Sequence, residues 1–240
     1  MRKTKTFFLV FFICLFIQVH LANSLQIHDN TSLIPAGEFL MGTEEGTKIE
    51  RPVHKVYLGK FRMSWFEVSN IEFEIFQPNH TRSVSSPCDQ CPVTMVNWFE
   101  ASSYCKNKNG RLPSEAEWEK AARGPAEYRY SFGENPDQSK SNFGHEFQAG
   151  VKAVNSFQPN GFGLYNMSGN FWEWVDDWFS FYAKAKKKTR KEGMVFTEKI
   201  LRGGSWYNTA YYINVGMRFK INPDIKLNSI GFRCAWDVQQ

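Results

Sequence analysis

The stretch GLYNMSGNFWEWVDDW (residues 163–178) places one carboxylate, Glu173, between two tryptophans. An ionised carboxylate in aromatic surroundings is costly unless a cation lies beside it, so its partner is either an arginine or a metal ion. The residues alone leave this choice open. Asn166 and Glu173 supply hard oxygen ligands, bends at Gly163 and Gly169 expose backbone carbonyls, and no His or Cys lies within the stretch. A metal bound here would therefore be calcium.

The N-terminus has the features of an export signal. Basic residues precede an apolar run at 7–18, and Ala22 and Ser24 stand at the −3 and −1 positions of a small-residue cleavage site. Because the run is too short to span a bilayer, the pattern favours a cleaved signal over an N-terminal anchor helix. We expect residues 1–24 to be a signal peptide and residues 25–240 to be one exported domain without a stable membrane span. Its destination is a bacterial periplasm or the exterior, with a eukaryotic secretory lumen as the alternative.

The positive charge of the chain is concentrated in one run. The formal net charge is +5, and KAKKKTRK (184–191) holds six cations without an interleaved aromatic residue. Single-stranded nucleic acids are bound by basic grooves that also carry stacking aromatic rings. We therefore interpret the run as a solvated loop and expect no nucleic-acid partner.

Four of the five cysteines, Cys88, Cys91, Cys105 and Cys234, lie outside the predicted signal peptide. An even number of cysteines in an exported chain indicates disulfides before metal ligands. CDQC (88–91) could also be half of a zinc site or a redox pair, but no second CxxC motif or His pair accompanies it, so a local disulfide is favoured. Pairing of Cys105 with Cys234 would tie the middle of the chain to its end.

Three short helices are predicted by one device, an N-cap residue followed three positions later by a glutamate. The pairs are Ser69 with Glu72, Asn97 with Glu100, and Ser114 with Glu117. In the third helix, Trp118 and two alanines share the inward face, and Glu115, Glu119 and Arg123 are expected to point elsewhere.

Short strands are predicted at 38–42, 54–63, 199–206 and 230–236, each set between turn signals. No strand alternates regularly with a long crossover helix, so the sheets should be mostly antiparallel. With 16% aromatic residues and 17 glycines, the chain is typical of a single, loop-rich α+β domain with an aromatic core. No HExxH, GxSxG or Walker pattern is present.

Taken together, the motifs resemble the formylglycine-generating enzyme, or sulfatase-modifying factor, family. The resemblance covers nearly all of residues 34–236 and rests on IPAGEFLMGT, ERPVHKVYLGKFRMSWFEVSN, PVTMVNWFEASSYC, GRLPSEAEWEKAARG, NGFGLYNMSGNFWEWVDDW, LRGGSW and IGFRCA, in that order. It implies a variant of the C-type lectin-like fold, an α+β domain with little regular secondary structure and short antiparallel strands.

The resemblance also implies a metal site and a disulfide. The family's calcium site falls on Asn166 and Glu173 with the backbone oxygens of Gly169 and Phe171, so we expect bound Ca²⁺. The family's AYC and FRC cysteines match Cys105 and Cys234, which supports their pairing.

Active members of the family oxidise a sulfatase cysteine with copper held by two cysteines after GGSW or GGSY. Here these positions fall near Asn208 and Ile213, and no cysteine occurs between Cys105 and Cys234. Soft thiolates select Cu(I), whereas an amide and an aliphatic side chain do not replace them. Copper and formylglycine-generating activity are therefore not expected, and no catalytic residue is assigned.

The stretch 202–218 is expected to form the floor of an aromatic-lined cleft for a peptide or protein ligand. The candidate contacts are Ser205, Trp206, Asn208 and Arg218. Two functions remain open. The first is an exported binding or accessory module stabilised by calcium, and the alternative is an oxidoreductase of the same family that acts on a peptide or secreted product through a different catalytic centre.

Overall fold

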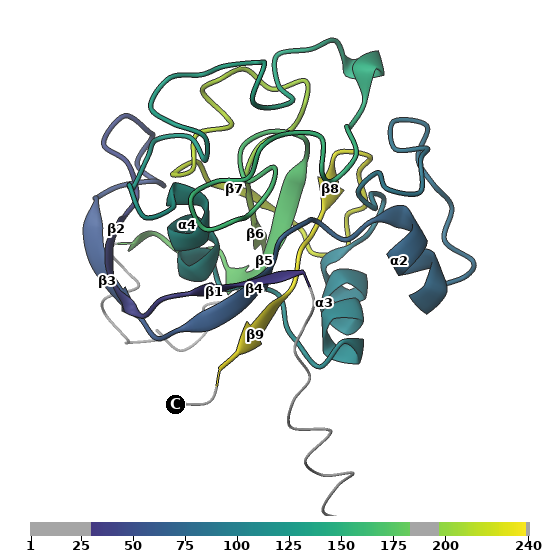
Figure 1. Cartoon of the computed structure of the whole chain (residues 1–240), viewed down its shortest axis with the longest axis horizontal. Helices are drawn as coiled ribbons and strands as arrows, with labels where there is room; N and C mark the ends of the chain where they lie inside the picture. The colour runs from purple at the N-terminus through teal and green to yellow at the C-terminus, as the bar shows by residue number, and fades with distance from the viewer. Residues whose placement is uncertain (1–29, 183–196, 239–240) are drawn as a thin grey trace, which may run out of the picture. The chain divides into compact units, whose positions relative to one another are not determined.

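Short strands and helices joined by long irregular connections make up the protein (Figure 1). The structure is a computed structural model that describes residues 30–182 and 197–238, and the described residues from Thr31 onward form one compact unit. The predicted signal peptide (1–24) and the basic run (184–191) lie outside the described residues. Within them, no helix has the length and apolar content needed to cross a membrane.

The strands are two to seven residues long and form three sheets. Their bounds are β1 (Thr31–Ile34), β2 (Gly37–Met41), β3 (His54–Leu58), β4 (Phe61–Ser64), β5 (Trp172–Trp178), β6 (Lys199–Arg202), β7 (Phe219–Ile221), β8 (Ile230–Gly231) and β9 (Ala235–Asp237). The sheets have the orders β1-β4-β9, β2-β3 and β7-β6-β5-β8.

All strand pairs are antiparallel except β5 with β8, which confirms the expectation of mostly antiparallel sheets. The predicted strand at 54–63 is two strands, β3 and β4, and the predicted strand at 230–236 is also two, β8 and β9. Strand β5 was not predicted. It runs through the middle of its sheet, where Glu173 lies opposite Arg202 of β6 and Gly231 of β8.

Helices α2 (Asn70–Phe76), α3 (Trp98–Asn107) and α4 (Glu115–Arg123) begin where the capping pairs predict, and a 3-10 turn, η1, covers Phe147–Ala149. At α3 the exchange is reciprocal: the Glu100 N–H donates to Asn97 Oδ1 at 2.9 Å, and the Asn97 N–H donates to the Glu100 carboxylate at 3.0 Å. Two otherwise unpaired amides of the first turn are satisfied in this way.

Helix α4 departs from the prediction because it buries charge. Glu115 and Glu119 were expected to point away from the core, but they are 5% and 0% exposed. Their carboxylates lie among arginines from the C-terminal half of the chain, which supply the charge that burial requires. The inward position of Trp118 is as predicted, since its indole is fully buried.

Both predicted disulfides are present. Cys88 pairs with Cys91, three residues away, and Cys105 on α3 pairs with Cys234, 129 residues away. In the chain-entropy description, the long loop stabilises the fold by about 5 kcal/mol and the short one by about 2 kcal/mol. Most of the covalent stabilisation therefore comes from the Cys105–Cys234 bond.

Candidate functional site

Glu173 is the second residue of the aromatic strand β5 and is paired with an arginine. The Arg233 guanidinium donates Nε to Glu173 Oε2 and Nη2 to Oε1, both at 2.7 Å, and the Trp118 indole N–H donates to Oε2 at 2.8 Å. Glu173 is 1% exposed and Arg233 is fully buried. Of the two partners that the sequence left open for Glu173, the structure contains the arginine.

Two further buried ion pairs join α4 to the 202–218 stretch. Glu119 accepts hydrogen bonds from Arg202 and from Arg123. Burial opposes ionisation of Glu119, but Arg202 and Arg123 outweigh it and lower the pKa of this carboxyl. Glu115 Oε1 accepts a hydrogen bond from Arg218 Nε at 2.5 Å.

Arg218, predicted as a cleft contact, is held by these interactions. Its guanidinium also donates to the carbonyls of Ile49 and Ser180 and lies 4.1 Å from the centre of the Tyr182 ring. The residue is 2% exposed. It joins α4 to neighbouring segments and presents no surface to a ligand.

A ladder of side-chain amides crosses the site and is organised by Glu67, a residue that the sequence analysis missed. Asn170 Nδ2 donates to Glu67 Oε1 at 3.0 Å and Asn166 Nδ2 donates to Oε2 at 3.1 Å. Asn142 Nδ2 in turn donates to Asn170 Oδ1 at 3.1 Å. Burial raises the pKa of Glu67 to about 7, with Arg233 acting in the opposite direction and the Glu173 charge adding to the rise.

The ladder fixes which end of each amide carries the oxygen. A carboxylate only accepts hydrogen bonds, so Glu67 takes the Nδ2 of Asn166 and leaves Asn166 Oδ1 facing away. Asn166 Oδ1 and Asn142 Oδ1 are both buried and have no hydrogen-bond partner among the described residues. A buried acceptor without a donor is costly, and a hard cation would satisfy it.

The predicted calcium ligands therefore fit the ion unequally. Asn166 fits, because its orphaned oxygen is the kind of ligand that calcium takes. The Gly169 carbonyl accepts the Phe171 N–H at 3.0 Å, and Glu173 is already charge-balanced by Arg233. A calcium ion here would depend chiefly on Asn166 and would share Glu173 with the arginine.

The opening of the 202–218 stretch is a tight turn that only glycine permits. Gly203 and Gly204 have φ values of +96° and +76°. A Cβ at Gly204 would lie 2.7 Å from the Tyr212 carbonyl oxygen and from Ile213 Cγ2. The two glycines therefore let this backbone lie directly against the segment around residue 213.

Ser205 and Asn208 close the next turn on each other. The backbone N–H and the hydroxyl of Ser205 both donate to Asn208 Oδ1, at 2.9 and 2.7 Å. Trp206 is fully buried and donates its indole N–H to the Phe147 carbonyl at 3.0 Å. Ile213 is also fully buried, in a cluster with Tyr130 and Phe143.

The large exposed side chains of this stretch are tyrosines that were not among the predicted contacts. Tyr207, Tyr211 and Tyr212 are 36%, 39% and 41% exposed, and Phe147 of η1 is 51% exposed. The Phe147 and Tyr207 ring centres are 5.3 Å apart, as are those of Tyr211 and Tyr212. We call these four residues the aromatic surface. Exposed aromatic pairs beside a fixed backbone turn are typical of interaction sites.

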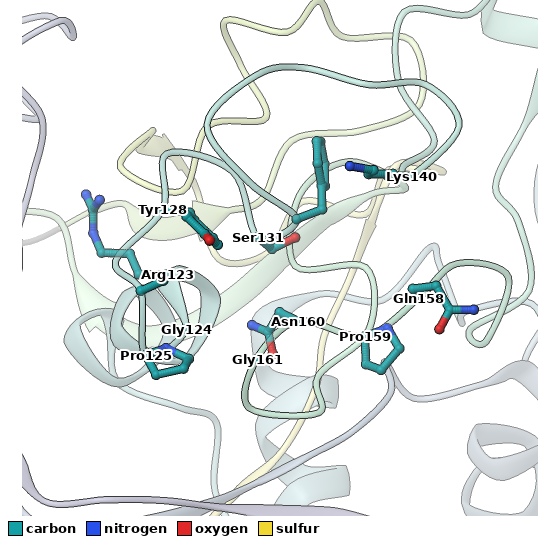
Figure 2. Close-up of a pocket in the computed structure, with 12 residues that line it drawn as sticks. Arg123, Gly124, Pro125, Tyr128, Ser131, Lys140, Gln158, Pro159, Asn160 and Gly161 are labelled. Atoms are coloured by element: carbon teal, nitrogen blue, oxygen red, sulfur yellow. The ribbon is translucent and has the colours of Figure 1, made fainter.

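A cavity of about 460 Å³ lies elsewhere on the molecule, between the end of α4 and the 158–161 turn (Figure 2). Arg123, Tyr128, Ser131 and Lys140 are among its lining residues, and none of the four predicted cleft contacts is. In residues 30–182 and 197–238, no three His, Cys, Asp or Glu side chains gather in an arrangement that could hold a metal ion.

Comparison with known proteins identifies the motifs as those of one family. Residues 20–238 match the sulfatase-modifying factor enzyme 1-like domain. The formylglycine-generating enzyme of Streptomyces coelicolor is 30% identical over 280 residues, which cover 85% of this chain and 88% of that enzyme. Serine/threonine-protein kinase pkn1 of Chlamydia pneumoniae is 35% identical over 235 residues, which cover 86% of this chain. The chain spans only 38% of the length of that kinase.

The fold is shared with solved structures. Treponema denticola variable protein 1 superposes with a TM-score of 0.73 at 23% identity, covering 86% of this chain and 94% of that protein. The predicted single α+β domain with short strands is confirmed.

Loss of the cation beside Glu173 should be severely destabilising. We expect Arg233→Ala to lower the free energy of unfolding by about 3–5 kcal/mol, because it leaves a buried carboxylate unpaired. Arg129→Ala, which removes a surface pair with Glu45, should cost less than about 1 kcal/mol. Guanidinium unfolding of both variants tests this, and comparable losses would contradict the central role of the buried pair.

Proposed function

The chain belongs to the sulfatase-modifying factor enzyme 1-like family, and we propose that it is an exported, calcium-stabilised binding or accessory protein that does not convert cysteine to formylglycine. Its ligand is a peptide or protein segment that lies on the aromatic surface. The observation that carries the proposal is the chemistry of Asn208 and Ile213, where the family resemblance places copper-binding cysteines.

Neither residue offers what Cu(I) prefers. Asn208 carries a hard amide oxygen that already accepts two hydrogen bonds from Ser205, and Ile213 is a buried aliphatic side chain. The four cysteines of the described chain are all joined in disulfides, so they present no thiolate. An oxidase of the family's kind would need a copper site built from other groups.

Binding is supported by the way the aromatic surface is mounted. Tyr207 lies within the Ser205–Asn208 turn, and its ring centre is 5.2 Å from that of the buried Trp206. Rigid aromatic side chains lose little conformational entropy when a ligand orders them, which suits them to recognition. An extended peptide would lie across the rings, with its backbone groups exposed to the nearby polar turn.

Calcium and export have separate support. The strongest argument for the ion is Asn166 Oδ1, which is buried without a hydrogen-bond donor. A calcium ion would coordinate this oxygen and stiffen the bend at Gly169. Two disulfides and an N-terminal sequence typical of a signal peptide favour an oxidising compartment outside the cytoplasm. The alternative, an oxidoreductase with a different catalytic centre, is not part of this proposed function.

The absence of oxidase activity is tested with a sulfatase-type CxPxR peptide. We expect its cysteine to stay unchanged, by mass spectrometry, when the protein is incubated with oxygen and Cu(I), because no thiolate pair is free to hold the metal. A formylglycine-generating enzyme in parallel verifies the assay. Formylglycine formed by this protein would refute this part of the proposal.

Peptide binding is tested by selection from a displayed peptide library. We expect enriched peptides to bind the protein and to lose at least about tenfold in affinity, or about 1.4 kcal/mol, when Tyr211 and Tyr212 are both changed to Ala. Tyr57→Ala is the matched control, because Tyr57 is an exposed tyrosine on β3 outside the aromatic surface. Failure to enrich any peptide, or equal losses in both variants, would count against this surface.

Calcium binding is tested by the calcium-dependent part of stability. At a calcium concentration of about 100 times Kd, we expect the free energy of unfolding to rise by about 2.7 kcal/mol over the value in EDTA. Asn166→Gly keeps the backbone conformation at φ +54° accessible but removes the oxygen, so the increment should disappear. It should persist in Asn208→Ala. An unchanged increment in Asn166→Gly would exclude this site.

A further inference from the structure

The two cysteines of CDQC (88–91) differ sharply in exposure. Cys88 is exposed, whereas Cys91 is 5% exposed and packs with Val151, Phe171 and Trp206. In a disulfide with one accessible and one buried half, an incoming thiolate reaches only the accessible sulfur. The direction of attack is thereby set by the fold.

The backbone on both sides of the disulfide is held by contacts that do not involve sulfur. Asn70 Nδ2 donates to the Cys88 carbonyl at 2.9 Å and to the Ser86 carbonyl at 2.8 Å. The Asn70 N–H donates to the Cys91 carbonyl at 2.9 Å.

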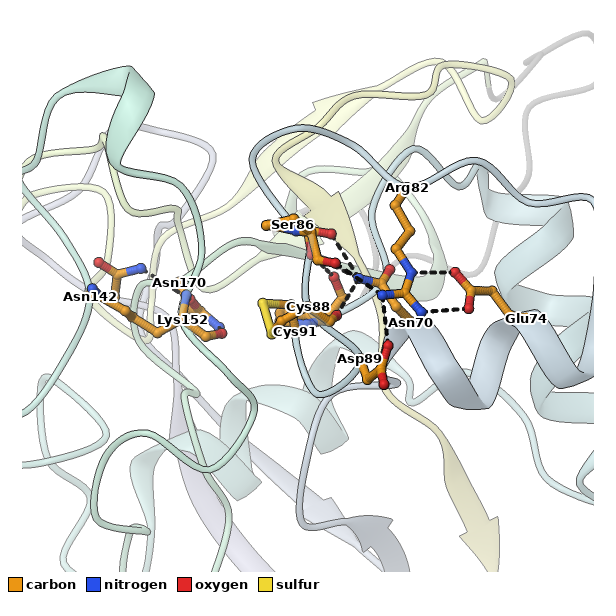
Figure 3. The surroundings of a disulfide bond; sticks show 12 residues. Asn70, Glu74, Arg82, Ser86, Cys88, Asp89, Cys91, Asn142, Lys152 and Asn170 are labelled. Atoms are coloured by element: carbon orange, nitrogen blue, oxygen red, sulfur yellow. Dashed lines mark hydrogen bonds and ion pairs between the residues drawn. A yellow bond between two sulfur atoms is a disulfide. The ribbon is translucent and has the colours of Figure 1, made fainter.

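Arg82 fixes the outer side of the same turn. It donates to the Pro87 carbonyl at 2.9 Å and lies 2.8 Å from an Asp89 carboxylate oxygen, while two of its nitrogens bind Glu74 of α2 (Figure 3). The Cα atoms of Cys88 and Cys91 are 5.0 Å apart within this frame. None of these contacts involves sulfur, so we expect them to persist after reduction and to hold the two thiols close enough to reoxidise.

We propose that Cys88–Cys91 is a thiol–disulfide exchange site that oxidises accessible dithiols of other polypeptides. A substrate thiolate attacks Cys88 Sγ, the Cys88–Cys91 bond breaks, and Cys91 leaves as a thiolate that takes up a proton. The second substrate thiolate then attacks the substrate sulfur that is bonded to Cys88 in the mixed disulfide. This forms the substrate disulfide and releases Cys88 as a thiolate, which takes up a proton. Two electrons pass from the substrate, which becomes a disulfide, to the pair, which becomes two thiols.

The second disulfide supplies an internal reference. Cys105 and Cys234 are 0% and 2% exposed and close a loop through most of the chain, so neither sulfur is open to attack in the folded state. Cys88–Cys91 joins residues only three positions apart, so opening this bond adds little conformational entropy to the unfolded chain. The two bonds therefore separate a reactive role from a structural one within one molecule.

The first experiment uses the unmodified protein. It is incubated in graded mixtures of reduced and oxidised glutathione, quenched with an alkylating reagent and mapped by peptide mass spectrometry. We expect Cys88 and Cys91 to be reduced at least about tenfold faster than Cys105 and Cys234, with the circular dichroism spectrum unchanged. Equal rates, or reduction only together with unfolding, would overturn the proposal.

The second experiment identifies the attacked sulfur and the substrate reaction. With oxidised glutathione, Cys91→Ser should form a mixed disulfide at Cys88 at least about tenfold faster than Cys88→Ser forms one at Cys91.

Oxidised wild-type protein should convert thiols of reduced, unfolded ribonuclease to disulfides, and the double variant Cys88→Ser/Cys91→Ser should not. A faster adduct at Cys91, or no oxidation of ribonuclease, would overturn the proposal. Neither readout depends on the aromatic surface or on calcium.

Discussion

The pairing of Glu173 with Arg233 is the constraint on which the rest of the structure depends. Arg233 also donates to the carbonyls of Trp65 and Tyr165, at 3.1 and 2.8 Å, so one guanidinium joins segments that are far apart in the sequence. The Trp118 indole N–H donates to the same carboxylate and so links helix α4 to it. Packing around a buried charge pair has little tolerance, because any displacement leaves an unpaired charge in a medium that solvates it poorly. Strand β5 is therefore fixed near its start.

Interactions between residues close in the sequence could be predicted from it, and interactions between distant residues could not. Capping pairs such as Asn97 with Glu100 lie three residues apart, so their positions predicted the helix starts. Strand β5 escaped prediction because its first four residues, Trp172–Val175, are all buried, and a strand covered on both faces shows no alternation. The burial of Glu119 depends on Arg202, 83 residues away, and no local pattern announces such a partner.

The candidate site shows the same limit. The resemblance located Asn166 and Glu173, but the orienting role of Glu67 comes from a segment about a hundred residues earlier. Glu67 follows two aromatic residues in SWFEVSN, a pattern shared with many surface glutamates. Ser205, Trp206 and Arg218 were chosen for their chemical types, yet burial has given them structural contacts, and the accessible groups beside them are tyrosines. Exposure is a property of the packed chain and could not be read from residue identity.

The Cys105–Cys234 bond closes the chain between these two cysteines into a covalent ring, which matters for proteolysis. A protease that cuts once between these cysteines, for example after one of the lysines at 184–191, produces two fragments that remain joined by the disulfide. The aromatic surface, β5 and the Glu173–Arg233 pair all lie in or against this ring. A nicked molecule would differ in mass from the intact one only by the added water, and its fragments would stay joined until a reductant opened the bond. Cleavage within this ring and separation of the fragments are thus separate events.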